Sequence, residues 1–459
     1  MIMKTIIRPE TEMKNSGIEW IGNIPKNWDA VQIRRVLLKD KNGIKIGPFG
    51  SALTNKTTGN DEYYVYSQAN LVSGDFSDTK NKVSQDVFNS LSNYEVVTGD
   101  VCLSMMGTIG KCRIIPHNIK KGIMDSHLIK IRLDNYNSRF FEYVYDKDNG
   151  GICFVQMQKE KKGSIMDGLN TSIVKGLYVT VPPLSEQQVI ADYLDKTCFQ
   201  IDEIIAEAKA SIDEYKELRQ GVIFEAVTKG LDKNVEMKDS GIEWIGEIPS
   251  SWHLTKVRRV IEQSKNGIKV GPFGSALTNK TSGEAPIYIY GQANLVANDF
   301  SFAKNRISEE TYSTLSSYEV VPGDICLSMM GTIGKCHTVP ENINKGIMDS
   351  HLIKIRLNDL MDNRYFEYVY DKDLSGICFI QMQYDKKGSI MDGLNTSIVK
   401  DLILPLPTKQ EQQMIVDYLD KEVPKIDSLI SEKESLINDL ESYKKSLIYE
   451  VVTGKRRVV

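Results

Sequence analysis

Apolar residues spaced three and four positions apart mark two long stretches of the chain, at about residues 201–227 and 426–452. The positions between them are mostly charged, so each stretch predicts an amphipathic helix of roughly 40 Å. So narrow a stripe on so long a helix requires a partner helix, and we expect the two stretches to pack on each other. The alternative is two core helices of ordinary domains. The first stripe comprises Ile201, Ile205, Ala208, Ile212, Tyr215, Leu218, Val222 and Ala226, and the second comprises Ile426, Ile430, Ile437, Leu440, Tyr443, Leu447 and Val451.

The two stretches belong to an internal repeat of about 224 residues. SGIEWIG at residue 16 returns at 240, and IKIGPFGSALTNKT at 44 returns at 268 with one substitution. CLSMMGTIGKC at 102 returns at 326, and GIMDSHLIKIRL at 122 returns at 346. A period this long indicates a duplicated domain followed by a helix, and not a solenoid.

Within each copy, short strand patterns broken by turn residues precede the long helix. In the first copy we expect strands at 63–66, 95–103 (with a turn at 98–100), 112–115, 127–133 and 176–181, and helices at 84–91 and 139–145. Residues 185–188 predict the cap of a short helix ending near 196, and Pro424 is expected in the first turn of the second long helix. The prediction is an α/β (α+β) chain with domains at 14–184 and 238–407 and helical regions at 185–230 and 408–454.

Composition and charge add few constraints. The net charge of −4 does not predict nucleic-acid binding, which would depend on local basic clusters. Seven cysteines without a C-x-x-C pair predict reduced, buried thiols and no zinc. No run of 18 apolar residues and no signal-peptide pattern is present, so we expect a cytoplasmic protein without a membrane segment.

No catalytic constellation emerges from the motifs. The turn GTIGK at 107–111 resembles a phosphate loop, but Met105 stands where that motif needs glycine and Cys112 where it needs serine or threonine. His127 and His351 follow Asp125 and Asp349 at a spacing of two without a nucleophile, which favours hydrogen bonding at a strand start. We therefore expect no catalytic residues and no bound metal.

Polar loops punctuated by glycine are the candidate binding surface. Lysine and arginine suit phosphates, while asparagine, glutamine and serine suit base edges; solvated turns are the alternative interpretation. Lys120 and Lys121 follow the GTIGK turn. The candidate DNA-binding residues are Lys45, Ser51, Asn55, Lys56, Gln68, Asn70, Lys111, Arg113, Lys161 and Lys162 in the first copy and Lys269, Ser275, Asn279, Lys280, Gln292, Asn294, Lys335, Lys386 and Lys387 in the second.

In its motifs the chain resembles, over nearly its whole length, the specificity (S) subunit of type I restriction–modification systems. The resemblance is carried by SGIEWIGNIPKNW at 16–28 and its twin at 240–252, IKIGPFGSAL at 44–53, the GTIGK turn, VPPLSEQQVIADYLDK at 181–196, and GVIFEAVTKG at 221–230 with SLIYEVVTGK at 446–455. It implies two α/β target-recognition domains and two helical regions packed as an antiparallel coiled coil. It also implies a subunit without activity of its own that selects a sequence of double-stranded DNA.

The same resemblance implies the partners and their cofactors. Methylation subunits, of which we expect two, would dock on the coiled coil and bring S-adenosylmethionine chemistry. Motor–nuclease subunits would join through them and use ATP, so this chain is expected to bind no cofactor itself. Helices separated by a whole domain can lie antiparallel, which would place the domains about a pseudo-twofold axis roughly 40 Å apart, close to one turn of DNA. The segment before the second copy also aligns with the chain start, as if the chain were cut from a ring.

This sequence departs from the usual S subunit because its two domains are similar from end to end. Two like readers related by a twofold axis read the same half-site on opposite strands, so we expect a palindromic or nearly palindromic interrupted target. Each half-site is expected to contain the adenine that such methylation subunits usually modify. The differences that could break the symmetry include Arg113 against His337 and Ser67 against Gly291. The alternatives are an S-like DNA-binding regulator without enzymatic partners and an enzyme whose catalytic residues carry no recognisable motif.

Overall fold

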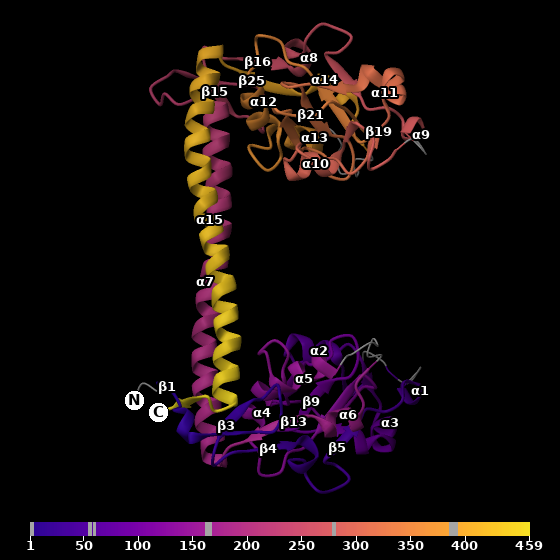
Figure 1. Cartoon of the computed structure of the whole chain (residues 1–459), viewed down its shortest axis with the longest axis vertical. Coiled ribbons are helices and arrows are strands. Elements are labelled where there is room, and N and C mark those ends of the chain that lie inside the picture. The colour runs from indigo at the N-terminus through magenta and orange to yellow at the C-terminus, as the bar shows by residue number, and fades with distance from the viewer. Residues whose placement is uncertain (1–3, 54–56, 58–60, 161–167, 278–280, 385–392) are drawn as a thin grey trace. The chain divides into compact units, whose positions relative to one another are not determined.

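The computed structural model describes residues 4–53, 57, 61–160, 168–277, 281–384 and 393–459. It divides into two compact units (Figure 1). The first comprises Met1–Ala208 with Ser435–Val459, and the second comprises Lys209–Glu434. Each unit therefore holds one copy of the repeated domain together with part of each long helix, α7 (Leu184–Lys229) and α15 (Lys409–Val452).

Two four-stranded sheets form the domain of the first unit. One is antiparallel, with the order β10-β9-β12-β5, and its central strands β9 and β12 are buried along their whole length. The other has the order β7-β6-β11-β8, in which β11 runs parallel to β6 and antiparallel to β8. The bounds are β5 (Ile44–Ile46), β6 (Tyr63–Tyr66), β7 (Lys82–Val83), β8 (Glu95–Val96), β9 (Val101–Ser104), β10 (Cys112–Ile114), β11 (Gly122–Met124) and β12 (Leu128–Ile131).

The second unit repeats both sheets with the same pairing. Its antiparallel sheet has the order β17-β24-β21-β22 and its mixed sheet the order β19-β18-β23-β20. The bounds are β17 (Ile268–Val270), β18 (Ile287–Tyr290), β19 (Arg306–Ile307), β20 (Glu319–Val320), β21 (Ile325–Ser328), β22 (Cys336–Thr338), β23 (Gly346–Met348) and β24 (Leu352–Ile355).

Small two-stranded sheets connect the domains to the helices. They pair β2 (Met13–Asn15) with β3 (Asn23–Pro25), β4 (Asp29–Gln32) with β13 (Tyr178–Val181), β14 (Met237–Asp239) with β15 (Glu247–Pro249), and β16 (His253–Lys256) with β25 (Ile403–Leu406). In the first unit β1 (Thr5–Ile7) also pairs antiparallel with β26 (Arg456–Val458). Non-covalent pairing thus joins the two ends of the chain where the second unit has the continuous segment after α7. This agrees with the ring-like alignment found in the sequence.

Short helices cover the sheets. In the first unit they are α1 (Gly50–Leu53), α2 (Gln68–Ser73), α3 (Gln85–Ser90), α4 (Ser138–Tyr145), α5 (Ile152–Glu160) and α6 (Thr171–Gly176). In the second they are α8 (Val257–Val260), α9 (Gly274–Leu277), α10 (Gln292–Ala297), α11 (Glu309–Leu315), α12 (Asn363–Tyr370), α13 (Ile377–Tyr384) and α14 (Thr396–Asp401). The predicted strands and the predicted helices at 84–91 and 139–145 are confirmed within two residues at each end, with the turn at 98–100 between β8 and β9. The sequence patterns missed β5, β7, β11, α5 and α6, and they treated the starts of α1 and α2 as loops.

The prediction of a short helix followed by a separate long one was wrong. α7 runs without a break for 46 residues and α15 for 44. The carbonyl of Pro183 accepts from the backbone N–H groups of Glu186 and Gln187, so the helix starts one residue before the predicted cap. Pro424 lies inside α15 and not in its first turn. Side chains such as Leu194 and Cys198 are buried across the expected break, and this packing keeps the backbone helical.

In each unit the parts of α7 and α15 pack antiparallel (Figure 1). In the first unit Thr180, just before α7, donates to the carbonyl of Val452 at the end of α15 (2.6 Å). In the second unit Tyr365 donates to Val227, at the end of α7 (3.1 Å), and more weakly to Pro405, just before α15 (3.5 Å). The start of one helix therefore meets the end of the other in both units.

The buried stripe follows the strict alternation of three and four, which corrects two predicted interface residues. Ile201, Ile205, Ile212, Ile426, Ile437 and Leu447 are buried, while Tyr215, Val222, Ile430 and Leu440 are half-buried. Leu218 and Tyr443 are instead 52% and 50% exposed. Spacing, and not apolar character, decides which face a residue occupies.

Charged residues take the stripe positions next to these two. The Lys444 ammonium lies 2.6 and 2.7 Å from the two carboxylate oxygens of Asp202 in the first unit. The Arg219 Nε lies 2.8 Å from Asp427 Oδ1 in the second. The two ion pairs occupy equivalent positions of the two repeats. Each unit therefore fixes the register of its helix pair with the same kind of ion pair.

A buried ionic centre stabilises each antiparallel sheet. In the first unit Asp100 accepts from Arg132 Nε (2.6 Å) and lies 3.6 Å from Lys130 Nζ, and Lys130 also donates to the Glu95 carbonyl. The side chains of Asp100 and Lys130 are only 2% and 3% exposed. Asp324, Lys354 and Arg356 form the matching centre in the second unit.

Candidate nucleic-acid interface

Three of the predicted DNA-binding cations are held inside their domains. Lys111 is buried and ion-paired with Asp148, and Lys335 is paired with Asp373. Arg113 lies 3.2 Å from Glu142 and 3.1 Å from Asp146, and His337 replaces it in the second unit. These charges are already compensated within their domains, while the side chains of Arg113 and Lys335 keep 28% and 19% of their surface exposed. Their contact with phosphates stays a prediction. The sequence showed the cations but not the carboxylates folded against them.

Asn70 and Asn294 serve the scaffold. The Asn70 side-chain oxygen accepts from the Ser67 backbone N–H (3.0 Å), and its amide nitrogen donates to the carbonyls of Asp75 (2.9 Å) and Asp78 (2.8 Å). Asn294 makes the corresponding bonds in the second unit. These amides close the start of α2 and α10, and Asn294 also lines an open cavity in the second unit. Their contact with DNA stays a prediction.

Several predicted residues cannot be placed in the interface. Asn55, Lys56, Lys161, Lys162, Asn279, Lys280, Lys386 and Lys387 lie outside the described residues. Ser51 and Ser275 fall in α1 and α9. Lys45 and Lys269 are half-buried, with their ammonium groups 5.1 Å and 4.5 Å from the ring centres of Tyr94 and Tyr318.

Gln68 and Gln292 each lie against the GTIGK turn of their own domain, a contact that the sequence did not indicate. Gln68 Nε2 donates to the Met106 carbonyl and to Thr108 Oγ1, both at 2.7 Å. Gln292 repeats both bonds with Met330 and Thr332. Figure 1 shows α2, which begins with Gln68, on the side of its domain along which the helix pair projects.

An aspartate–histidine pair adjoins each glutamine. Asp125 accepts from the backbone N–H of His127 (2.9 Å), and its other oxygen lies 3.3 Å from His127 Nδ1. Asp349 and His351 repeat this arrangement at 2.8 and 3.3 Å. Burial raises the pKa of the Asp125 carboxyl, and the bond from His127 opposes that shift. The motif search set these residues aside because they lack a nucleophile, yet they are positioned for binding.

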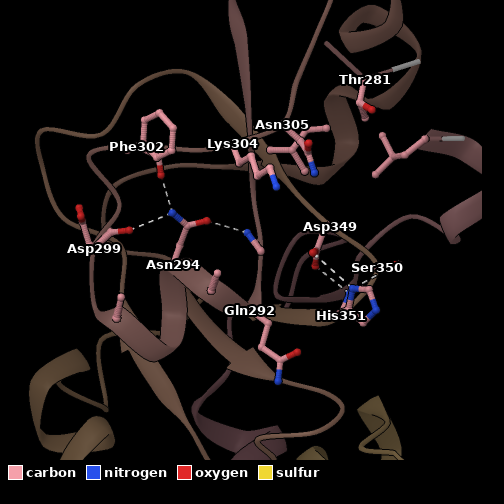
Figure 2. A pocket seen from close by; sticks show the side chains of 15 residues that line it. Thr281, Gln292, Asn294, Asp299, Phe302, Lys304, Asn305, Asp349, Ser350 and His351 are labelled. Atoms are coloured by element: carbon pink, nitrogen blue, oxygen red, sulfur yellow. Dashed lines mark hydrogen bonds and ion pairs between the residues drawn. The ribbon is translucent and has the colours of Figure 1, made fainter. Parts of the chain in front are cut away.

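In the second unit these side chains border an open cavity of about 670 Å³. Figure 2 shows Lys304 and Asn305 on one side of it and Gln292, Asp349 and His351 on the other. Gly291, at the start of α10, and Phe302 also line it. The cavity therefore joins the Lys304 cation to the Asp299 and Asp349 carboxylates and to several neutral polar groups, an arrangement suited to a polar ligand.

Cations over aromatic rings flank this region and were largely missed in the sequence. In the second unit Arg306 lies 4.2 Å from the Tyr288 ring centre and Lys345 lies 4.1 Å from that of Tyr312. In the first unit Lys82 and Lys120 lie 4.8 and 5.0 Å from the ring centre of Tyr64. Only Lys120 and Lys121 stood out in the sequence, because the others are brought together by strand pairing.

Two exposed aromatic residues were also missed. Phe49 and Phe273 are 87% and 86% exposed, at matching positions before α1 and α9. The loop before Phe49 is fixed, since a Cβ on Gly47 would lie 1.7 Å from the Asp125 carbonyl oxygen. The backbone two residues before each ring therefore packs against the aspartate of the pair, at Gly47 on Asp125 and at Gly271 on Asp349.

Known proteins resemble this chain in sequence and in fold. The family model described as "Type I restriction modification DNA specificity domain" matches residues 26–214 and again 269–439. The chain belongs to this family. It is a DNA sequence-specificity subunit of a type I restriction–modification system, as the sequence resemblance predicted.

Relatives and solved structures cover most of the specificity subunit. It is 24% identical to the type I restriction enzyme MjaVIII specificity subunit of Methanocaldococcus jannaschii, over 74% of this chain and 75% of the relative. A chain from a structure on complex assembly and conformational transition of the type I R-M system matches with a TM-score of 0.68 at 13% identity, covering 94% of this chain and 98% of that one. The HsdS subunit from Thermoanaerobacter tengcongensis matches with a TM-score of 0.52 at 16% identity and the same coverage.

Among the residues that the structure describes, no helix is long and apolar enough to cross a membrane. No group of three or more histidine, cysteine, aspartate or glutamate side chains there could hold a metal ion. All seven cysteines are buried, and burial raises the pKa of Cys102 and of Cys326 to about 12.

Proposed function

We propose that this subunit selects a bipartite, nearly palindromic site on double-stranded DNA, with each domain reading one half. The chain itself catalyses nothing. Methylation subunits bound to its helices supply S-adenosylmethionine chemistry, and motor–nuclease subunits that use ATP join through them. The protein acts in the cytoplasm, where DNA is accessible.

The observation that carries the proposal is the likeness of the two interfaces. Gln68 and Gln292 bond to the same turn, and the pairs Asp125–His127 and Asp349–His351 have the same geometry. Both domains also place lysine or arginine over tyrosine beside these groups. Cations that contact phosphates and polar groups that contact base edges are the two parts of sequence-specific readout. Two domains with the same binding groups are expected to recognise the same half-site sequence.

The helices offer matched apolar surfaces for the methylation subunits. In the first unit Val189 and Ile204 are 42% and 46% exposed, and in the second Met414 and Leu429 are 53% and 41% exposed. Tyr443 and Leu218, which the sequence analysis placed inside the coiled coil, add to these sets. In the first unit the Asp202–Lys444 ion pair places Ile204 and Tyr443 at the same height along the helix pair. In the second unit the Asp427–Arg219 pair does the same for Leu429 and Leu218. One such surface in each unit supports two bound methylation subunits.

Methylation mapping by single-molecule sequencing tests the proposal. The subunit is expressed with its methylation subunit in cells free of other adenine methylation, and cells carrying the methylation subunit alone are the control. We expect an interrupted motif with like halves, modified on both strands. Halves that differ at most of their matching positions would contradict the argument from like domains. No new modification, with the partner shown to be folded and bound, would favour an S-like regulator without enzymatic partners.

A further inference from the structure

The cavity of the second domain suggests which part of the DNA it receives, an inference that rests on the proposed function. We infer that it takes the major-groove edge of one base pair, and that Asp349 accepts a hydrogen bond from the exocyclic amino group of adenine or cytosine. We further infer that Gly291 sets the position of this carboxylate, so that the two domains discriminate differently at one matching position.

The groups on one wall of the cavity are acceptors. Gln292 Nε2 donates to the Met330 carbonyl and to Thr332 Oγ1, so Gln292 Oε1 remains as a hydrogen-bond acceptor. Asp349 accepts from the His351 backbone N–H, and its two oxygens have capacity for further donors. The ring of His351 adjoins this carboxylate, with Nδ1 3.3 Å from Asp349 Oδ2. Figure 2 shows these three side chains along the same side of the cavity.

An acceptor-rich wall selects an amino group. Adenine N6 and cytosine N4 donate in the major groove, whereas guanine O6 and thymine O4 accept there and would face the carboxylate without a proton between them. Lys304 and Arg306 beside the cavity supply the opposite charge that the flanking phosphates require. A carboxylate at this place is therefore a discriminating group within a surface that attracts DNA.

Gly291 leaves room that its counterpart does not. A Cβ at Gly291 would lie only 2.5 Å from Asp349 Oδ2. In the first domain Ser67 carries that Cβ, and its hydroxyl accepts from the Ala69 backbone N–H. The Asp125 side chain is also less exposed than that of Asp349, at 17% against 23%. One atom at the start of α10 thus changes the space beside the carboxylate, whose bonds to His351 match those of Asp125 to His127.

The substitution Gly291→Ser is compatible with folding. The only close atoms belong to the end of a rotatable carboxylate, and serine is the better helix N-cap. Ser67→Gly makes the reciprocal change. Asp349→Asn keeps the shape and removes the acceptor charge. Glu310→Gln, on exposed α11, removes an equal charge away from the cavity and is the matched control.

The experiment uses the full-length subunit with its methylation subunit. Methylated motifs are first mapped for the wild type and the four variants. We expect D349N and G291S to alter one position of one half-site, S67G to alter the matching position of the other, and E310Q to alter none. Unfolding midpoints verify that each variant is folded.

Binding is then measured on duplexes in which the amino base at that position is replaced by purine, for adenine, or by 2-pyrimidinone, for cytosine. The wild-type complex should lose about tenfold in affinity and D349N less than about twofold, because the amino group has no charged acceptor to lose. Equal losses in both complexes, or a motif unchanged in D349N and G291S, would overturn this inference alone. A wild-type complex that selects no sequence would overturn the proposed function as well.

Discussion

The buried centre around Asp100 gives the sharpest prediction about stability. Asp100→Asn keeps the size of the side chain and removes the only negative charge beside Lys130 among the described residues. Lys130 is 3% exposed, and Arg132 stays nearby as a like charge. Burial already lowers the pKa of the Lys130 ammonium even with its partner present. The variant therefore leaves a buried cation without compensation.

The cost of such a stranded charge is about 3–5 kcal/mol. Total stability of a domain is about 5–15 kcal/mol, so the variant removes a third or more of it in many cases. The urea midpoint of the first unit should fall by about 1 M or more, taking a slope of about 3 kcal/mol per M. Lys130→Met should cost less than about 2 kcal/mol, because Asp100 keeps Arg132 and the Val97 backbone N–H.

Urea unfolding followed by hydrogen exchange and mass spectrometry assigns the loss to one unit. Asp324→Asn is the internal replicate and should affect the second unit alone. The double variant D100N/K130M should be more stable than D100N, since it contains no stranded ammonium. If the double variant is no more stable than D100N, the cost has another origin and this reasoning is refuted.

Three further predictions concern docking, pH and the end of α15. Ile204→Asp and Leu429→Asp should each reduce the bound methylation subunits from two to one by native mass spectrometry, while Ala210→Asp, an exposed control, leaves two. Burial lowers the pKa of His337, so the neutral imidazole is favoured in the folded state. The stability of the second unit is then full above the ordinary value of about 6.5 and falls as the pH drops below it, and His337→Asn should remove that dependence in urea unfolding. Gly454→Ala should destabilise the first unit by about 1–3 kcal/mol in the same assay, because its φ is +71° and a Cβ would lie 2.5 Å from a proline ring; an unchanged midpoint would contradict this.

The repeat and the period of its apolar residues determined much of the fold in advance. Strands such as β6 and β9 are short apolar runs between turn residues, so the local pattern predicted them. The break expected after residue 196 was wrong because local cap signals compete with packing, and the buried side chains of Leu194 and Cys198 favour a continuous helix. Leu218 was wrongly predicted in the helix interface because it is apolar, although its spacing places it outside the buried stripe.

The candidate interface was less accessible to sequence reasoning. Residue type identified Gln68 and Gln292 as candidates, and the structure places each at the start of a helix against the GTIGK turn. Lys111 and Arg113 looked equally suitable, but the carboxylates that neutralise them lie about 30 to 40 residues away and meet them only through packing. The sequence showed the Asp-x-His spacing of Asp125–His127 and Asp349–His351. It did not show the cavity that Asp349 and His351 line.

By itself, the sequence determined that the chain is a duplicated domain with two long amphipathic helices, because periodicity and repetition are properties of neighbouring residues. It also determined the family, through motifs that recur in order. Only the tertiary structure decided which charges are free, because an ion pair depends on distance in space. It likewise showed why glycine at 291 and serine at 67 are not equivalent. A Cβ at Gly291 would lie 2.5 Å from the carboxylate of Asp349, which is 58 positions away in the chain.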